Sequence, residues 1–489
     1  MKVLFIIPYL NIARHTLPNS LRKFSPPEIP HNGVAALTIF LQQNKVEIKV
    51  VDERLGYSFK EILKQIQDFS PDLIGITMTS FCSKKVNMLV KWLKEHISIP
   101  ILLGGAHISV MRKEALDYND ADFAIKHEGE YAILELLDAI KSNKGFEEIR
   151  GLIWRKDGKI IENPDREPIK DIDELPFPDY DSFELDKYYA WQNKIIPILT
   201  SRGCPFRCVF CSAGVVMGSR IRMRSPANVL EEIEYWYKKG IRTFDINDEI
   251  FTCNPKRVDE ICDLIIKRGL KIKFRCYNGI RVDTVTQDLL KKMRDAGCTD
   301  IAFGVETGNE QIMKNIKKGI TLEQARKAIG WAKSLGIRVR ANFIVGHPGE
   351  TMETAMDTLR FANEVGADEI NFNNLVPYPG TELFGWVKAN GKFIIPPEKY
   401  MNDLSSYKIR DPVFETKEFS AEERRKMIKL MTLATRRKYL ESRLRKPATN
   451  IAFFISRTDL GYRVLETLRK SNVYTKLFRK SLIKVEVPK

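Results

Sequence analysis

The sequence predicts an α/β chain with two parallel-sheet domains followed by a basic, mostly helical region. Three observations lead to this expectation. Apolar runs alternate with amphipathic helical segments over residues 1–144, the alternation resumes after residue 190, and residues 386–489 turn helical and rich in Lys and Arg. Strands separated by helices of about 10–15 residues are typical of parallel sheets covered by helices on both faces. A chain of 489 residues is long enough for two or three domains.

In residues 1–144 the pattern predicts a doubly wound parallel sheet. The expected strands are Val3–Pro8, Val46–Asp52, Leu73–Met78 and Ile101–Gly104. The expected helices are Gly33–Asn44, Ser58–Asp68, Ser83–His96 and Tyr131–Lys141. Because ligands of such sheets bind at the carboxyl ends of the strands, we expect a site near Thr77–Phe81 and Gly104–His107.

Residues 145–190 are expected to link two domains, because their Pro- and Asp-rich stretch ENPDREPIKDIDELPFPDYDSF has no strand or helix periodicity. In residues 191–385 the expected strands are Ile195–Ser201, Thr243–Asn247, Lys273–Tyr277, Ile301–Val305, Arg338–Val345 and Glu369–Leu375. The helices expected between them include Asn228–Lys239, Pro255–Arg268, Gln287–Ala296, Leu322–Leu335 and Thr351–Val365. Six such units predict a partial α/β barrel with its chemistry at the carboxyl ends of the strands.

The basic character of the chain belongs to its C-terminal tail. The formal net charge is +16, but residues 421–489 hold 19 Lys and Arg against 6 Asp and Glu, so the first 420 residues carry only +3. Thr416–Ser442 is expected to form a helix, and Ile451–Leu468 and Tyr474–Ile483 are further mixed apolar and basic segments. The residues expected on one face of the helix are Met427, Leu430, Met431 and Ala434.

This tail is expected either to cap the barrel mouth as a solvated helical layer or to contact something acidic. An anionic membrane surface and an acidic protein or peptide both suit a basic amphipathic face. Nucleic acid is disfavoured, because no recognisable nucleic-acid-binding module is present. No run approaches the ~18 apolar residues of a spanning helix, and the opening MKVLFIIPYL lacks a signal-peptide cleavage site. We therefore expect a cytoplasmic protein, with peripheral membrane contact through the tail as an alternative.

Three of the eight cysteines form a cluster with metal-ligand spacing. Cys204, Cys208 and Cys211 follow the first expected barrel strand as C-x-x-x-C-x-x-C, whereas the other five are scattered. Structural zinc normally takes four protein ligands, and no nearby fourth Cys or His completes such a set. Ferredoxin-type clusters are also held by four cysteines, so three suit a 4Fe–4S cluster with one iron left open.

With Phe210 before its last cysteine, this motif resembles that of the radical SAM superfamily. The resemblance implies that the open iron is chelated by S-adenosylmethionine (SAM). An electron from an external donor would then cleave the sulfonium to give a 5′-deoxyadenosyl radical.

Further motifs at the expected strand ends resemble those of the same superfamily. They are Asn247–Phe251, Cys276–Asp283, Phe303–Gly308, Asn342–Thr351 and Pro377–Thr381. The resemblance implies SAM contacts from Phe210, Asp248, Glu249, Asn278, Arg281, Glu306 and Val345. Asp248-Glu249 stands where Asp-Asp is commoner, so which carboxylate meets the SAM ammonium stays open. A guanidinium such as that of Arg281 suits a carboxylate through bidentate hydrogen bonds.

Residues 1–144 resemble the cobalamin-binding domain that precedes many radical SAM domains. The motifs that carry this resemblance are Pro30–Leu41, Val51–Gly56, Gly75–Ser80, Leu103–His107 and His127–Glu130. The cobalamin contacts it implies are Thr77, Thr79, Ser80, Gly104, Gly105, His107 and Gly129. One departure matters: Arg54 stands where some cobalamin domains carry an axial histidine, which implies base-off binding without histidine below the cobalt. A ligand-free flavodoxin-like domain is the alternative.

The combined resemblance, over residues 1 to about 385, is to the cobalamin-dependent class B radical SAM methyltransferases. It implies methylation of an unactivated carbon through a 5′-deoxyadenosyl radical and methylcobalamin. Ring formation, rearrangement or carbon–carbon coupling on the same architecture is one alternative, and a non-catalytic cobalamin-binding protein is another. The substrate stays open among a lipid, a tetrapyrrole, a protein side chain and a small metabolite.

Overall fold

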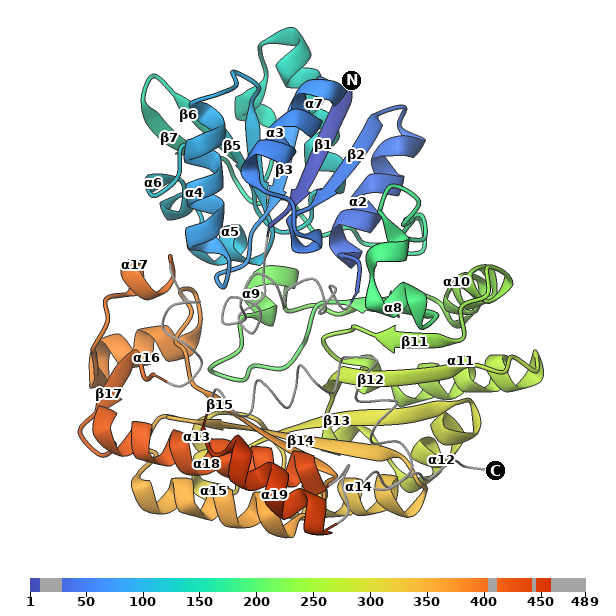
Figure 1. Ribbon diagram of the computed structural model, residues 1–489, viewed down its shortest axis with the longest axis vertical. Helices are drawn as coiled ribbons and strands as arrows, with labels where there is room; N and C mark the ends of the chain where they lie inside the picture. The colour runs from blue at the N-terminus through green and yellow to red at the C-terminus, as the bar shows by residue number, and fades with distance from the viewer. Residues whose placement is uncertain (9–28, 403–410, 442–445, 459–489) are drawn as a thin grey trace.

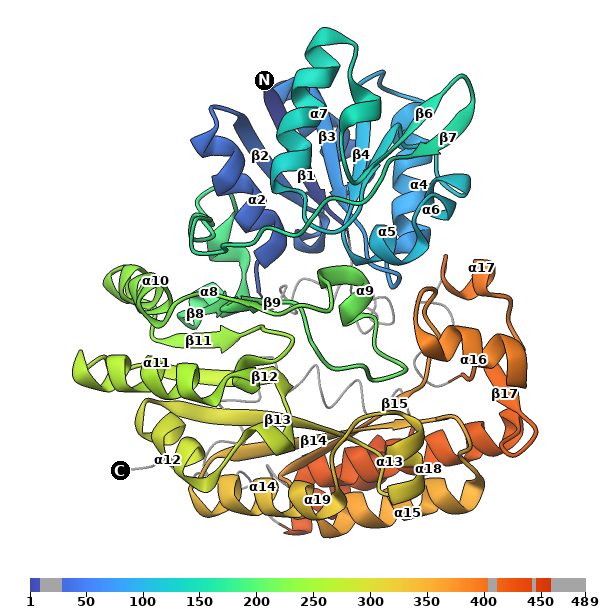
Figure 2. The same cartoon turned by 180° about the vertical axis from the view of Figure 1, so that it is seen from behind.

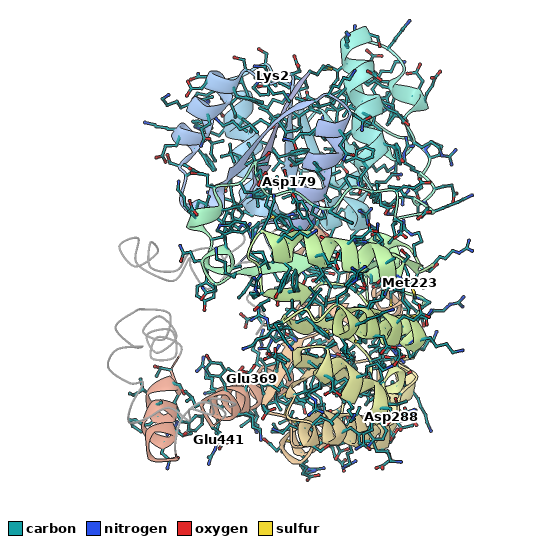
Figure 3. All side chains as sticks on the ribbon, turned by 90° about the vertical axis from the view of Figure 1, so that its right-hand side faces the viewer. Lys2, Asp179, Met223, Asp288, Glu369 and Glu441 are labelled. Carbon is teal, nitrogen blue, oxygen red and sulfur yellow. The ribbon has the colours of Figure 1, made fainter. Side chains whose placement is uncertain are left out.

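The computed structural model describes residues 1–8, 29–402, 411–441 and 446–458. Its two large sheets, one mostly and one wholly parallel, lie one above the other (Figure 1). The predicted α/β fold class is confirmed. Asp179, in the connection between the sheets, lies between the first domain and the barrel (Figure 3).

The first sheet has seven strands in the order β2-β1-β3-β4-β5-β6-β7. Its strands are β1 (Lys2–Ile7), β2 (Glu47–Asp52), β3 (Leu73–Thr77), β4 (Ile101–Gly104), β5 (Phe123–Ile125), β6 (Leu152–Lys156) and β7 (Lys159–Glu162). The first five are parallel, whereas β6 and β7 pair antiparallel. In β1 every residue after Lys2 is buried, as expected of a central strand covered on both faces.

Helices cover both faces of this sheet (Figures 1 and 2). Its helices are α2 (Asn32–Gln43), α3 (Phe59–Phe69), α4 (Ser83–Lys94), α5 (Ala106–Met111), α6 (Glu114–Asp117) and α7 (Glu130–Ser142). The buried residues of α2 and α7 share one core cluster with outward residues of β1, and those of α3 and α4 share another. Ser58 caps α3 in a reciprocal capping box with Glu61, which fixes where that helix begins.

The sheet continues past residue 144, the expected end of the first domain. The hairpin of β6 and β7 lies within the segment assigned to the connection, yet β6 pairs with β5. The expected boundary therefore falls two strands early. The three-residue β5 gave no recognisable pattern in the sequence, so the partner of β6 could not be foreseen.

The second sheet has six parallel strands in the order β15-β14-β13-β12-β11-β8. They are β8 (Ile195–Ile198), β11 (Thr243–Ile246), β12 (Lys273–Ile280), β13 (Cys298–Glu306), β14 (Arg338–Val345) and β15 (Glu369–Asn374). The main helices are α10 (Pro226–Lys238), α11 (Pro255–Lys267), α12 (Gln287–Asp295), α14 (Leu322–Ser334) and α15 (Met352–Glu364), with the shorter α13 (Glu310–Asn315). They follow the strands in order along the outside (Figure 2). This is the expected partial barrel, and each expected strand is present.

A short hairpin and helix occupy the mouth of this barrel. Strands β9 (Ser201–Arg202) and β10 (Arg222–Met223) pair antiparallel, and α9 (Ala213–Met217) lies between them in the chain. The three-cysteine loop connects β9 to α9, on the side that faces the first domain (Figure 2).

The C-terminal region covers the edge of the barrel. Its elements are α16 (Glu382–Asn390), β16 (Gly391–Phe393), α17 (Pro397–Tyr400), β17 (Phe414–Thr416), α18 (Ala421–Glu441) and α19 (Lys446–Ser456). Helix α18 packs against the edge strand β15 and against α15. Its buried apolar residues are Ala421, Met427, Ile428, Met431 and Leu440, while Leu430, expected on that face, is 40% exposed.

A helix is present where one was predicted over 416–442, but it begins only at Ala421, because Phe414–Thr416 forms β17, and Ile428 rather than Leu430 is buried. The segment Tyr474–Ile483 and most of Ile451–Leu468 lie outside the described residues. Within the described part of the chain, no helix has both the length and the apolar content to cross a membrane.

Candidate active site

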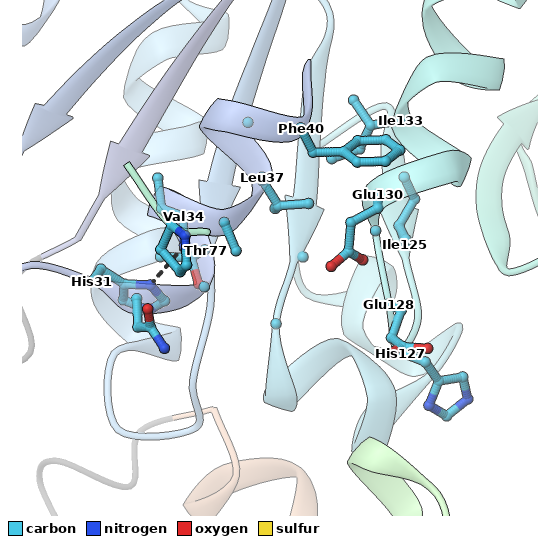
Figure 4. A pocket seen from close by; sticks show the side chains of 18 of the residues that line it. His31, Val34, Leu37, Phe40, Thr77, Ile125, His127, Glu128, Glu130 and Ile133 are labelled. Carbon is cyan, nitrogen blue, oxygen red and sulfur yellow. Dashed lines mark hydrogen bonds between the residues drawn. The ribbon is translucent and has the colours of Figure 1, made fainter. Parts of the chain in front are cut away.

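A cavity of about 1360 Å³, its open mouth included, lies between the first domain and the barrel. Its deep part is an apolar slot between the first sheet and helices α2 and α7, where Leu37, Phe40, Ile125 and Ile133 gather (Figure 4). Its remaining walls come from the connection and the barrel mouth: Ile172, Leu175, Pro176, Pro178, Leu199, Arg202, Met217 and Arg224.

Four of the seven predicted cobalamin residues line this cavity: Thr77, Gly104, Gly105 and Gly129. The two adjacent glycines differ in what they allow. A Cβ on Gly104 would meet nothing within 4 Å, so that backbone borders open space. A Cβ on Gly105, whose φ is +102°, would lie 2.8 Å from the carbonyl oxygen of Met78. A side chain at position 105 would collide with the backbone that follows β3, so glycine is required there. The glycine at position 104 instead leaves room for a ligand.

The other three predicted residues, Thr79, Ser80 and His107, do not line the cavity. The hydroxyl of Ser80 lies 3.0 Å from Nδ1 of His107, and that imidazole is fully buried. Burial lowers the pKa of His107 to about 4. Its Nε2 has no hydrogen-bond partner among the described residues. His107 is therefore a neutral side chain packed beside the cavity rather than in its wall.

Arg54, which stands at the position of the axial histidine, is held by an ion pair. Its guanidinium donates three hydrogen bonds to the two carboxylate oxygens of Asp52, with distances between 2.6 and 3.0 Å. The hydroxyl of Tyr188, from the connection, donates to the same carboxylate. Close by, His31 lines the cavity and caps α2, its Nδ1 accepting from the amide of Val34 at 3.2 Å. Burial, aided by the charge of Arg54, lowers the pKa of His31 to about 4.

Buried ion pairs join the cavity wall to the cysteine loop. Glu128 accepts from Arg202 at 2.7 Å and from Arg222 at 2.8 Å, and Glu130 accepts from Arg202 at 2.8 Å. These four side chains are between 6% and 11% exposed. Arg202 precedes Cys204 by two residues. No sequence motif identified Arg202 or Arg222, because their partners lie more than 70 residues away in the chain.

The cysteine loop is anchored by its backbone. Gly203 has φ +92°, and a Cβ there would lie 2.5 Å from the carbonyl oxygen of Arg220. The amide of Val209 donates to the carbonyl of Ile316 at 3.1 Å, and its carbonyl accepts from Leu383 at 2.8 Å. These bonds tie the loop to the helices on either side of it.

The three thiols are free, with Cys204 buried, Cys208 half-buried and Cys211 exposed. Burial raises the pKa of Cys204, and the nearby charge of Cys208 raises it further. The three thiols are not close enough together to hold a metal ion as they stand: among the described residues, no three His, Cys, Asp or Glu side chains form such a group. As a donor set, three free thiols on one loop still fit a cluster with one open iron.

The two adjacent carboxylates at the end of β11 have different environments. Asp248 is fully buried and accepts from the amide and hydroxyl of Thr200 and from the hydroxyl of Ser201, each at 2.6 Å. In Glu249, Oε2 is buried and has no hydrogen-bond partner among the described residues. Burial, with a contribution from Asp248, raises the pKa of Glu249 to about 7. Of these two carboxylates, Glu249 alone has an oxygen without a partner among the described residues, and this oxygen is left for a ligand.

Arg281 and Glu306 lie beside the cysteine loop. Arg281 donates to both oxygens of Asp283, at 2.9 and 2.8 Å, and its guanidinium carbon lies 3.7 Å from the ring centroid of Phe206. Glu306 has φ +74°, a strained conformation, and pairs with the buried Lys318 at 2.9 Å. Burial raises the pKa of Cys208, while the charges of Lys318 and Arg281 oppose that rise.

Sequence reasoning missed Lys318, because this residue belongs to none of the recognised motifs.

Of the remaining predicted SAM residues, Asn278 is exposed, and Val345 ends β14 with its side chain packed against α18. Phe210 lies 5.6 Å from the ring of the fully buried His347.

Comparison with known proteins agrees with this geometry. The chain matches the model of the radical SAM superfamily over residues 198–362 and that of the B12 binding domain over residues 25–137. It is 32% identical to an uncharacterized methyltransferase of Pyrococcus horikoshii, covering 88% of this chain and 91% of that protein. It is 26% identical to the cytidylyl-2-hydroxyethylphosphonate methyltransferase of Streptomyces wedmorensis, covering 81% and 83%. It is 31% identical to an anaerobic magnesium-protoporphyrin IX monomethyl ester cyclase of Rubrivivax gelatinosus, covering 66% and 60%.

Solved structures share the fold. The radical SAM methyltransferase TsrM of Kitasatospora setae, with tryptophan and a SAM analogue bound, superposes with a TM-score of 0.68 at 19% identity, covering 81% of this chain and 79% of that one. The cobalamin-dependent radical SAM enzyme OxsB, with cobalamin and SAM bound, gives 0.68 at 19% identity, covering 96% and 75%. The predicted cofactor set of 4Fe–4S cluster, SAM and cobalamin agrees with both domain matches. The protein is an enzyme, and the chain belongs to the cobalamin-binding radical SAM methyltransferase family.

Proposed function

We propose that this enzyme methylates an unactivated carbon of its substrate, with an external protein or reductant supplying electrons. When bound, the cluster and SAM would supply a hydrogen-abstracting radical, and cobalamin would carry the methyl group. The observation that carries the proposal is the cavity shared by the two domains, whose wall residue Arg202 lies two positions from Cys204. The chain's own part is to bind, orient and shield the reacting groups.

Cys204, Cys208 and Cys211 would hold the cluster. Cys208 lies near Lys318 and Arg281, whose positive charges favour its thiolate form. The hydrogen-bonded backbone around Val209 would keep the cysteine loop, and with it the three thiols, in place.

For SAM we assign the ammonium to Glu249 rather than Asp248. All the hydrogen bonds of Asp248 support the corner between β8 and β9, whereas Glu249 has a free buried oxygen. Arg281, oriented by Asp283 and stacked on Phe206, would bind the carboxylate. Glu306 would accept from the ribose hydroxyls, with Lys318 holding its carboxylate in place.

For cobalamin we assign the interdomain cavity. Its apolar slot suits an aromatic base, and the open space at Gly104 suits close approach of a planar ring. Arg54, which stands where some cobalamin domains carry a histidine, is held by Asp52, so the cofactor would be held by the walls of the cavity without a histidine from this position.

Ring formation is the second candidate, because the chain is also 31% identical to a cyclase over 66% of its length. A non-catalytic cobalamin carrier would not need the cluster motif, and all three cysteines are present. Contact of the basic tail with an anionic membrane stays a proposal, since α18 uses its apolar face to pack on the barrel.

The test is anaerobic reconstitution with iron and sulfide, addition of cobalamin, and reaction with methyl-labelled SAM under reduction. We expect a 4Fe–4S spectrum, formation of 5′-deoxyadenosine, and label in a product of a cell extract. Absence of 5′-deoxyadenosine would contradict the radical mechanism. Product formation without label would favour ring formation over methyl transfer.

A further inference from the structure

The inward face of the barrel is polar along two neighbouring strands. On β14 buried and half-exposed residues alternate, and the buried set packs against the outer helices: Val339, Ala341 and Phe343. Since side chains alternate across a strand, Arg340 and Asn342 face the barrel interior. On β15, Ile370 and Phe372 pack with this outer core, so the intervening Asn371 and the following Asn373 face inward.

The register brings three amides together. Asn342 pairs directly with Asn371, and Asn373 lies one step further toward the barrel mouth, beside Ile344. Successive inward residues of a strand are about 7 Å apart, so the three amides form one patch. None of the three side chains makes a hydrogen bond with another residue in the described ranges of the chain.

Below this patch the barrel is closed by ion pairs whose charges balance. Arg340 donates to Glu369 at 3.0 and 2.6 Å, and Arg275 donates to Asp245 at 2.5 and 2.6 Å. The remaining members of this layer are Arg338, which also pairs with Glu369, and Tyr277, which donates to Asp300 at 3.2 Å. A small cavity is lined by Tyr277, Asp300, Arg338, Arg340 and Glu369. Three guanidiniums face three carboxylates, so the layer offers no net charge to a ligand.

Closed α/β barrels fill their interior with Val, Ile and Leu. Here the interior instead presents amides, each with two N–H donors and one acceptor oxygen. Leaving such groups without partners when a ligand excludes water costs ~1–3 kcal/mol each, so an apolar ligand would be disfavoured and a hydrogen-bonding one favoured.

We propose that Asn371 and Asn373, with Asn342, bind the non-reacting part of the substrate, and that this part is uncharged and rich in hydroxyl or amide groups. The substrate is then a small water-soluble molecule rather than a lipid or a tetrapyrrole. This inference rests on the proposed methyl transfer. The named relatives do not decide it, since some carry names of tetrapyrrole enzymes and another that of a cytidylyl phosphonate enzyme.

The test uses the reconstituted holoenzyme, methyl-labelled SAM and an extract of the organism that carries the gene, partitioned after reaction between water–methanol and chloroform. We expect label in the water–methanol phase. The double variant Asn371→Leu/Asn373→Leu should lose at least about tenfold of that label, while SAM binding and extract-independent formation of 5′-deoxyadenosine stay within about twofold. Asn363→Leu, on the outer helix α15, is the matched control and should behave as the wild type.

Label in the chloroform phase would overturn the inference and leave methyl transfer intact. So would a double variant that keeps wild-type label, or one that loses SAM binding together with label, because the amides would then serve the fold or SAM. No label in either phase, with 5′-deoxyadenosine formed, would instead contradict the proposed methyl transfer and the inference with it.

Discussion

Asp248 and Glu249 are adjacent in the chain, yet the structure separates their contributions. Asp248 accepts three short hydrogen bonds from Thr200 and Ser201, and Glu249 keeps a buried oxygen without a partner among the described residues. A carboxylate with three donors stabilises the corner that carries them, and a carboxylate oxygen with none is available to a cation.

Substituting each carboxylate by its amide should therefore have different effects. We expect Glu249→Gln to weaken SAM binding roughly tenfold to hundredfold, since hydrogen bonds to charged groups contribute ~1.5–3 kcal/mol, with little change in thermal stability. Asp248→Asn should lower the melting temperature, because an amide nitrogen would face the donors of Thr200 and Ser201. Anaerobic calorimetry of SAM binding and a thermal melt measure the two effects, and equal loss of SAM binding in both variants would contradict the assignment.

Glu350 should make folding stability depend on pH. Burial raises the pKa of this fully buried carboxyl to about 7, above its ordinary value. The folded state therefore holds the proton more tightly than the unfolded state, and stability falls as pH rises from about 4 to about 7.

The variant Glu350→Gln should lack this loss. We expect it to match the wild type near pH 5 and to exceed it near pH 7.5 by up to ~3 kcal/mol, at about 1.4 kcal/mol per pKa unit. Urea unfolding at the two pH values measures the difference, with the exposed Glu353→Gln as control. Parallel pH profiles for Glu350→Gln and wild type would refute the prediction.

At this scale the sequence predicts residues that carry a motif and misses those that do not. The cysteine triplet and Arg281 follow local spacing and resemblance. The different roles of Asp248 and Glu249 depend on hydrogen-bond donors 48 residues earlier in the chain. Lys318 belongs to no motif, yet its ammonium donates to Glu306. Pairings of this kind are set by tertiary contacts, so a single sequence does not reveal them.

At the scale of elements, α18 is part of the barrel rather than an appendage. The phenyl ring of Phe419 and the side chains of Met427, Ile428 and Met431 pack with Val345, the last residue of β14. An edge strand with free backbone groups would invite pairing with another chain, and α18 covers that edge.

The substitution Met431→Asp should disrupt this packing, because it places a carboxylate in a fully buried apolar cluster. We expect a loss of ~3–5 kcal/mol or aggregation. Leu430→Asp, at a neighbouring position that is 40% exposed, should stay within about 0.5 kcal/mol of the wild type. Thermal melts and size-exclusion chromatography compare the two, and equal behaviour would mean that α18 does not pack as described.

Strands that are continuous apolar runs or alternate clearly were predicted closely, whereas strands without either pattern were not. The limits expected for β4 and β14 agree with the structure residue for residue. The three-residue β5 and the hairpin β6–β7 were missed, because a strand so short offers no alternation to recognise.

At the scale of the whole molecule, the ion pairs of Glu128 and Glu130 with Arg202 and Arg222 set how the first domain meets the barrel. Removing one partner of a buried ion pair costs ~3–5 kcal/mol, since the other charge stays buried.

We expect Glu128→Gln/Glu130→Gln to loosen this contact. The variant should be cleaved faster by protease in the connection of residues 163–188, and its ratio of methylated product to 5′-deoxyadenosine should fall by about tenfold. Glu135→Gln, whose partner Arg166 lies in an exposed pair, is the control. If the double variant keeps both the wild-type cleavage rate and the wild-type product ratio, the ion pairs do not position the domains.

The shared cavity also has a consequence for the order in which the protein is made. Its walls begin at Phe5 and are complete only at Arg224, with the connection between them. A ribosome releases the slot of the first domain long before it releases the barrel mouth that closes it. The cavity therefore reaches its full form only after the chain has passed residue 224, and the first domain alone presents its apolar slot without the barrel wall that covers it.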